Sequence, residues 1–165
     1  MVNPSPIEFR PADLAQHMAS CITFRRDSFP INFGNEKSFE NEMGKGGVDY
    51  ASQLIEFQQQ YPYGVIHVFR GDDIIGQIDY RIEDLFTDKA FISMFYLIPA
   101  ARGQGIGSLM HEYLIKSLRE QGCNGARILI QSSNERGVSF YKQHNWRYVK
   151  PDLNNSNIDT YQLNF

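Results

Sequence analysis

One stretch of the sequence limits the possible folds more than any other: residues 90–98 are nearly all apolar, and Pro99 ends the run. Such a run is typical of a strand that is buried on both faces. Beyond a glycine-rich segment, apolar residues recur at helical spacing, and Gly122 follows as the expected helix C-cap. These residues are Ile106, Leu109, Met110, Tyr113, Leu114 and Leu118. The pattern predicts a buried strand that turns through glycines into an amphipathic helix.

The rest of the chain has the pattern of short strands and further helices. Strands are expected at 7–10, 65–69, 74–82, 127–131, 146–149 and 160–165, and helices near 14–22, 50–58 and 134–141. Gly76, inside a predicted strand, marks a bulge or a close approach of another backbone. A loop rich in glycine, asparagine and serine is expected at 28–47. This order of elements predicts a single α+β, α/β-like domain with a mixed sheet.

Composition and charge exclude several classes of protein. Apolar residues make up 42% of the chain and charged residues 21%, which does not fit a disordered protein. The net charge of -3 argues against non-specific binding of nucleic acid. The sequence contains neither a signal-peptide pattern at its start nor the ~20 consecutive apolar residues of a membrane span. We therefore expect a soluble cytoplasmic protein that binds neither nucleic acid nor membrane.

The two cysteines are Cys21 and Cys123, and they fit no metal-like spacing. Sequence alone allows a disulfide between them, but two free thiols in a reducing compartment are favoured. No metal is expected.

The glycine-rich segment between the strand and the helix has the features of an anion site. It consists of Arg102, Gly103, Gln104, Gly105, Ile106 and Gly107. Free backbone N–H groups at a helix start point outward with the positive end of the helix dipole, and glycines let a ligand approach closely. The segment lacks the lysine of a Walker loop, and Ser108 or Met110 stands where a dinucleotide fingerprint needs its third glycine. The alternative is an ordinary glycine-rich helix start, in which Ser108 caps the turn instead of bonding a phosphate.

The segment 96–110 resembles the acetyl-CoA motif of the GNAT superfamily of N-acetyltransferases. The family pattern Gln/Arg-x-x-Gly-x-Gly/Ala is met by Arg102, Gly105 and Gly107. A second family element follows at 134–141, where the pattern Asn-x-x-(small)-x-x-(apolar)-Tyr begins at Asn134 and ends at Tyr141. His144, Asn145 and Trp146 then stand in place of a Leu-Gly-Phe ending. Asn145 is a minor departure, because asparagine also tolerates the left-handed conformation. The two elements, in the right order and spacing, lie within residues 90–149.

The resemblance implies a fold and a donor site. The fold would be one GNAT-type domain over residues 1–165, with a mixed, mostly antiparallel sheet of six to seven strands, about four helices and splayed central strands. Acetyl-CoA, as co-substrate, would lie in that opening beside a bulged strand. The backbone of Leu97 and Ile98 would pair with its pantetheine arm, and the N–H groups of residues 102–108 would hold its pyrophosphate. Asn134 would contact the pantetheine, and Tyr141 would be the general acid. A homodimer is a further expectation from the family.

The general base has two candidates in the sequence. The acceptor amine must lose a proton before it attacks the thioester, because an alkyl-ammonium group has a pKa near ~10.4. The family often uses a glutamate on the bulged strand or on the one before it, but residues 90–98 contain no acid. Asp79 and Glu83, on the preceding strand, are the candidates, and a water chain that ends on backbone carbonyls is the alternative. Without such a function, Asp79 would be a solvent-facing strand residue and Tyr141 part of the core.

The acceptor itself is poorly specified by the sequence. The resemblance assigns its site to residues 24–63 and 148–161, and the cluster at 25–29 would bind an acceptor carboxylate or peptide, or form surface salt bridges. The acidic balance of the chain mildly favours a cationic acceptor. Two alternatives to acetyl transfer remain: a non-catalytic acyl-CoA sensor or docking module, and a transferase that uses another short acyl-CoA.

Overall fold

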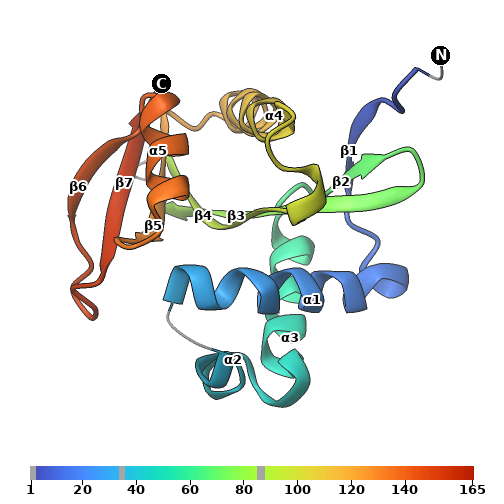
Figure 1. Ribbon diagram of the computed structural model, residues 1–165, viewed down its shortest axis with the longest axis horizontal. Coiled ribbons are helices and arrows are strands. Elements are labelled where there is room, and N and C mark those ends of the chain that lie inside the picture. The colour runs from blue at the N-terminus through green and yellow to red at the C-terminus, as the bar shows by residue number, and fades with distance from the viewer. Residues whose placement is uncertain (1–2, 34–35, 85–87) are drawn as a thin grey trace.

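In the computed structural model, which describes residues 3–33, 36–84 and 88–165, the strands form one seven-stranded sheet (Figure 1). The strand order is β1-β2-β3-β4-β5-β7-β6, and every neighbouring pair is antiparallel except β4 with β5. The strands are β1 (Ile7–Pro11), β2 (Val65–Arg70), β3 (Asp73–Asp84), β4 (Lys89–Leu97), β5 (Gly125–Gln131), β6 (Arg147–Pro151) and β7 (Ile158–Asn164). The helices are α1 (Leu14–Phe33), α2 (Glu36–Met43), α3 (Val48–Gln60), α4 (Ile106–Glu120) and α5 (Glu135–Gln143), with the short 3-10 helices η1 (Lys45–Gly47) and η2 (Pro99–Ala101). The predicted mixed, mostly antiparallel sheet is confirmed.

Helices cover both faces of the sheet. Figure 1 shows α4 on one face and α1 and α3 on the other. Met110 and Leu114 of α4 are buried against the central strands, as their helical spacing predicts, whereas Leu109 is exposed. Cys21 of α1 and Leu54 of α3 belong to a separate core cluster on the opposite face. In the described part of the chain, no helix is both long and apolar enough to cross a membrane.

The prediction of a loop at 28–47 is wrong. α1 continues to Phe33, and α2 and η1 occupy most of the remaining segment up to residue 47, while residues 34 and 35 lie outside the described residues. Phe29 and Phe39 are fully buried, and their rings meet edge to face at 5.7 Å between centroids. This contact explains the error, because tertiary packing of aromatic side chains overrides the low helix propensity of Asn32 in α1 and Ser38 in α2.

Strand β4 contains the bulge that the family resemblance implies. Asp79 of β3 pairs with Met94 and the next residue, Tyr80, pairs with Ile92, so Ser93 is an extra residue on β4. The parallel pairing of β4 with β5 covers only residues 89–92 of β4, whereas β5 continues to pair with β7 as far as Gln131. Beyond Ile92 the two central strands therefore separate, which confirms the predicted splay.

The bulge also changes the face of the sheet toward which the side chains of β4 point. Because side chains alternate along a strand, one extra residue reverses the alternation. Before the bulge, Ile92 belongs to the core beneath α4, and after it Phe95 packs against that same core. Met94 and Tyr96 instead form a cluster with Phe24 of α1. The prediction that both faces of β4 are fully buried is wrong, since its odd-numbered residues remain partly exposed.

Gly76 lies where two backbones approach closely, as predicted. A Cβ atom at this position would lie 2.5 Å from the carbonyl oxygen of Tyr96. The register of β2 against β3 also shifts next to it, between Val68 and Phe69. Glycine is therefore needed for β3 to lie against the part of β4 that follows the bulge.

Candidate active site

The glycine-rich segment adopts the conformation that an anion site requires. Gly103 and Gly105 have φ values of 74° and 82°, in the left-handed region that favours glycine. Gly105 is the N-cap of α4, and no side chain among the described residues caps this helix. The N–H groups of the first turn, from Ile106 to Ser108, have no preceding turn to bond to. The described atoms also leave open space around the Cβ positions of Gly103 and Gly105. The start of α4 can thus accept an anion on backbone N–H groups.

The polar side chains of the segment brace it from within. The Nε of Arg102 donates to the carbonyl oxygen of Leu97 at 2.8 Å, and its guanidinium lies over the Tyr96 ring. Gln104 donates to the Ala100 carbonyl at 3.0 Å and accepts from Arg70 of β2 at 3.0 Å. Arg102 therefore joins the segment to β4, and Gln104 joins it to β2. Sequence reasoning assigned them to the pyrophosphate site and did not detect these contacts.

The first turn of α4 is held against the end of α5. A Cβ on Gly107 would lie 3.2 Å from the Phe140 ring, so this glycine allows the two helices to pack closely. The Nδ1 of His144 donates to the Phe140 carbonyl at 2.8 Å, which leaves Nε2 for a second polar contact. Ser108 Oγ lies 3.2 Å from that Nε2. The hydroxyl of Ser108 is thus engaged by His144, while its backbone N–H remains in the first turn.

A second polar contact joins α4 to the segment after α5. Trp146 Nε1 donates to His111 Nε2 at 2.9 Å. Burial, followed by the nearby His144 ring, lowers the pKa of His111 to about 4, so the ring stays neutral and can accept this bond. Asn145 has a φ of 69°, in the left-handed conformation predicted to be tolerable there. The sequence signal for this contact was present, because His144 and Trp146 replace apolar residues of the family pattern, but it was not interpreted.

The backbone of Leu97 faces the side on which β4 and β5 separate. The N–H of Ile98 donates to the carbonyl of Ile75 on β3, at 2.9 Å, and its own carbonyl accepts from Ala101, so both groups are engaged. Neighbouring peptide groups of a strand point to opposite sides. Leu97 therefore directs its backbone groups away from β3, and its carbonyl meets Arg102 on that side. Of the two residues predicted to pair with pantetheine, Leu97 is the one whose backbone N–H faces away from β3.

Tyr141 covers the splay from α5. Its ring is buried, 6.1 Å from the Phe95 ring on β4 and 5.3 Å from the Trp146 ring. Burial raises the pKa of the Tyr141 phenol well above its usual range, so the hydroxyl keeps its proton at neutral pH. Asn134 is the N-cap of the same helix and accepts from the Gly137 N–H at 3.0 Å. Asn134 thus caps α5, and its contact with pantetheine stays a prediction.

Asp79 does not face solvent, so the alternative interpretation of this residue is wrong. Its side chain is 1% exposed, and the hydroxyl of Tyr50 and the amide of Gln77 donate to its two carboxylate oxygens at 2.5 and 2.8 Å. Burial raises the pKa of Asp79, against the opposing effect of these two hydrogen bonds and of Arg25. The polar contacts continue from Gln77 to His67 at 3.0 Å. Asp79 is therefore part of an enclosed network between the sheet and the two helices α1 and α3.

This buried network holds the bulge in β4. Arg25 of α1 donates to the carbonyl of Ser93 at 2.8 Å, and the hydroxyl of Ser93 donates to the carbonyl of Asp79 at 3.2 Å. The Arg25 guanidinium also lies 5.6 Å from the centre of the Tyr50 ring, whose hydroxyl donates to Asp79. Arg25 is 8% exposed. The interpretation of residues 25–29 as a surface salt-bridge cluster is therefore wrong.

Cys21 and Cys123 are both buried free thiols, as expected. Cys21 ends the polar network, with its sulfur 3.3 Å from Nε2 of His67. Burial, with a smaller effect of Asp79, raises the pKa of Cys21 to about 12, so this thiol stays protonated and unreactive.

Glu83 lies away from the bulge. Its carboxylate pairs with Arg127 of β5 at 2.7 Å. Its neighbours in β3, Ile82 and Asp84, pair with Ala90 and Lys89, at the end of β4 where β5 is still its partner. The structure thus brings Asp79, but not Glu83, next to Ser93.

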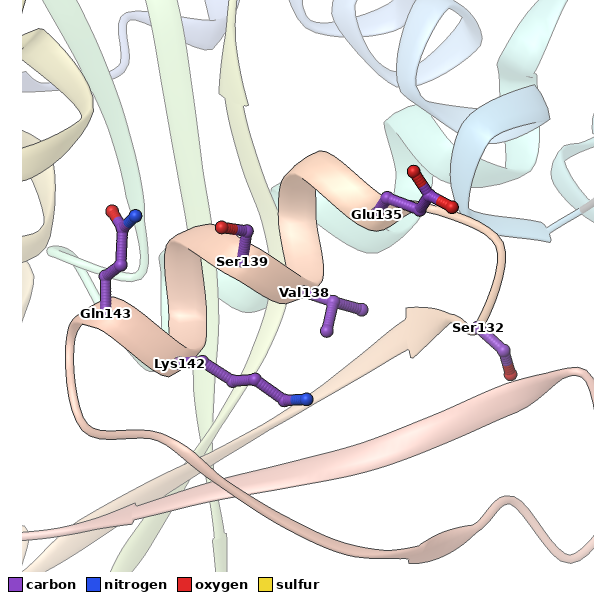
Figure 2. A pocket seen from close by; sticks show the side chains of 6 residues that line it. All are labelled: Ser132, Glu135, Val138, Ser139, Lys142 and Gln143. Atoms are coloured by element: carbon purple, nitrogen blue, oxygen red, sulfur yellow. The ribbon is translucent and has the colours of Figure 1, made fainter.

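Two surface hollows flank the helices of the site. One, of about 500 Å³, lies along α5 and the end of β5, and Figure 2 shows its six lining side chains. Tyr141 and Asn134 are not among them, so this pocket lies apart from the splay. The other, of about 770 Å³, lies beside α4 and includes Ser108 and His144 next to the start of that helix.

Comparison with known proteins agrees with this geometry. The model of the acetyltransferase (GNAT) family matches residues 26–146. PaiA N-acetyltransferase from Thermoplasma acidophilum, in complex with coenzyme A, is 18% identical with a TM-score of 0.78, over 97% of this chain and 99% of that one. The yncA protein from Salmonella typhimurium, with its cofactor acetyl-CoA, is 17% identical with a TM-score of 0.75, over 97% and 94% of the two chains. Ribosomal-protein-alanine N-acetyltransferase from Brucella melitensis is 17% identical with a TM-score of 0.74, over 96% and 99%.

No curated protein matches the sequence. At such low identities the solved structures show a shared fold, whereas the family match extends over well over half of the chain. This protein belongs to the GNAT family of acetyltransferases.

Proposed function

We propose that this protein transfers the acetyl group of acetyl-CoA to a primary amine, by direct attack within a ternary complex. One observation carries the proposal: the bulge at Ser93 and the splay beyond Ile92 lie directly before a helix start that has free N–H groups and no side-chain cap. Two structures of the same fold contain coenzyme A or acetyl-CoA, which supports the choice of donor.

The donor would be bound mainly by backbone. Residues 102–108 would hold the pyrophosphate through N–H groups, and Leu97 would pair with the pantetheine arm. The backbone N–H of Leu97, beside the thioester, would also help to stabilise the oxyanion that develops when an amine attacks. Tyr141, whose phenol keeps its proton at neutral pH because burial raises its pKa, would then give that proton to the departing thiolate.

Two routes for the proton of the acceptor amine fit the geometry. In the first, Asp79 receives it, helped by a carboxyl pKa that burial raises. Because Tyr50 and Gln77 enclose this carboxylate, the proton would travel through water or through the Tyr50 hydroxyl. In the second route, water passes the proton along backbone carbonyls to solvent. Glu83 is the weaker candidate, since it is paired with Arg127 at the closed end of the splay.

The donor site is tested by replacing Gly105 with Ala. This change strains a residue with φ of 82° and places a methyl group in the open space before α4. We expect acetyl-CoA to bind at least about tenfold more weakly in calorimetry, because the methyl group and the strain both oppose the bound loop. Gly122→Ala is the matched control, with φ of 85° and equally open surroundings at the other end of the same helix. Equal affinities in the two variants would remove the start of α4 from the donor site.

A second function has one observation in its favour. The enclosure of Asp79, together with the lack of an acid in 90–98, suits a module that binds acyl-CoA without turnover. Calorimetric binding of acetyl-CoA without thiol release on any primary amine would select this function. Competition between acetyl-CoA and longer acyl-CoA esters would show which of these esters is the preferred donor.

A further inference from the structure

The acceptor must reach the splay from the face that carries α1. The proposed pyrophosphate site is the start of α4, and Tyr141 covers the splay from α5, so both donor contacts come from helices on one face. A second substrate in a ternary complex needs a separate approach. On the opposite face, α1 contacts β3, β4 and β5 and so passes across the separating strands (Figure 1). Residues of α1 that meet β4 beyond the bulge are therefore placed to contact the acceptor.

Asp27 is an acidic side chain of α1 that is fixed to β4 beyond the bulge. The hydroxyl of Tyr96 donates to Asp27 Oδ2 at 3.0 Å. Tyr96 itself is 4% exposed and stacks on Phe24 at 5.0 Å, whereas Asp27 is exposed to solvent. Burial, followed by the contact with Asp27, raises the pKa of Tyr96 to about 12, so the phenol remains a donor. A buried anchor on the bulged strand thus holds an accessible carboxylate.

The arginines around Asp27 are directed elsewhere. Arg26 lies over the Phe39 ring, Arg102 donates to Leu97, and Arg25 donates to Ser93. Neither of the two ion pairs found among the described residues includes Asp27. The Asp27 carboxylate is therefore available to a positively charged ligand.

The position of Asp27 suits binding better than proton abstraction. The thioester would lie against the backbone of β4, and the full length of the Tyr96 side chain separates that backbone from Asp27. A carboxylate at that distance does not reach the attacking nitrogen, but it reaches a second group further along the same acceptor. A carboxylate held by a phenol accepts charge-assisted hydrogen bonds from an ammonium group.

We propose that Asp27 binds a second positive charge of the acceptor, so that the favoured substrates are diamines and longer polyamines. This proposal rests on the proposed acetyl transfer. The attacked amine would enter the splay beside the bulge, and the distal ammonium would pair with Asp27 at the surface. The proposal predicts discrimination between acceptors of equal length that differ only in the distal charge.

The test compares 1,4-diaminobutane with 1-butylamine in the wild type and in Asp27→Asn. Asparagine keeps the shape and still accepts the Tyr96 hydrogen bond, so the fold is expected to survive, which thermal unfolding checks. We expect KM for the diamine to rise about tenfold, since a charge-assisted hydrogen bond is lost, while KM for butylamine and for acetyl-CoA stays unchanged. Glu112→Gln, which removes an exposed carboxylate from α4 on the opposite face, should change none of these values.

Salt gives a second readout. The diamine KM of the wild type should increase with ionic strength, and that of Asp27→Asn should not, because the exposed charge pair is screened. A diamine preference that persists in Asp27→Asn would overturn the proposal. If no amine is acetylated at all, the proposed function fails, and calorimetry of the diamine against the coenzyme A complex still decides: Asp27-dependent binding supports the subsite, and equal or absent binding in both proteins overturns it.

Discussion

Replacement of Tyr141 by Phe is expected to lower kcat about 100-fold and to leave the calorimetric affinity for acetyl-CoA nearly unchanged. Loss of a positioned proton donor typically costs that much or more, because the thiolate must then leave unprotonated. The ring contacts with Phe95 and Trp146 do not involve the hydroxyl, so the variant should fold as the wild type does. Steady-state thiol release measures the effect.

Tyr113→Phe is the matched control for this variant. Tyr113 is a partly buried tyrosine of α4, and its ring stacks on the Phe9 ring at 4.3 Å between centroids. Phe9 belongs to β1, at the edge of the sheet away from α5. Removal of the Tyr113 hydroxyl should leave kcat within about twofold, because this hydroxyl lies away from the proposed site. Full turnover in Tyr141→Phe would remove Tyr141 from the acid step.

The pH profile of the wild type depends on the same residue. Activity should rise with pH as the acceptor loses its proton, toward the ~10.4 of an alkyl-ammonium group. Burial raises the pKa of Tyr141, which means that its active, protonated form persists as the pH increases. We therefore expect kcat/KM to approach a plateau, without the alkaline loss that an unshifted tyrosine near pH ~10 would cause. A bell-shaped profile that declines below that pH would contradict the assignment.

Replacement of Arg25 by Met is expected to lower the free energy of unfolding by about 2–3 kcal/mol, the cost of losing a buried hydrogen bond from a charged donor. Arg25 donates to the Ser93 carbonyl in the bulge and opposes the rise of the Asp79 pKa. Without it, the bulge loses its donor and Asp79 takes up a proton more readily. Because the bulge forms the splay, kcat should fall together with stability. Urea unfolding and thiol release measure the two effects.

Arg26→Met provides the comparison. Arg26 is the exposed neighbour of Arg25 in α1 and contacts only the face of Phe39 among the interactions described for it. Its replacement should change stability by no more than about 0.5 kcal/mol, the range of most surface substitutions. If Arg25→Met and Arg26→Met were equally stable and equally active, the buried network would have no part in holding the bulge.

The donor half of the site was predictable because its determinants are local. A proline that ends an apolar run, glycines that adopt positive φ, and apolar residues at helical spacing specify β4, the turn and α4 from residues close in sequence. Asn134 as a helix cap and Asn145 in the left-handed conformation are of the same kind, and the structure contains both. The family pattern added the bulge in β4, which the structure places at Ser93, and the splay, and no local rule predicts either of them.

The acceptor half was not predictable in the same way, because its contacts join distant segments. Asp79 is buried by Tyr50, which lies on α3, and Tyr96 meets Asp27 of α1. The helices at 28–47 depend on the contact of Phe29 with Phe39, which outweighs local propensity. A single sequence shows the residue types in such contacts but not which of them meet.

The central claim, acetyl transfer to a primary amine, is tested most directly by thiol release from acetyl-CoA with a panel of primary amines, measured together with the mass of the acceptor product. We expect thiol release that depends on the amine, that matches the acetylated amine formed, and that is strongest for diamines. Failure of the protein to bind acetyl-CoA at millimolar concentration, or thiol release that no amine accelerates, would contradict acetyl transfer.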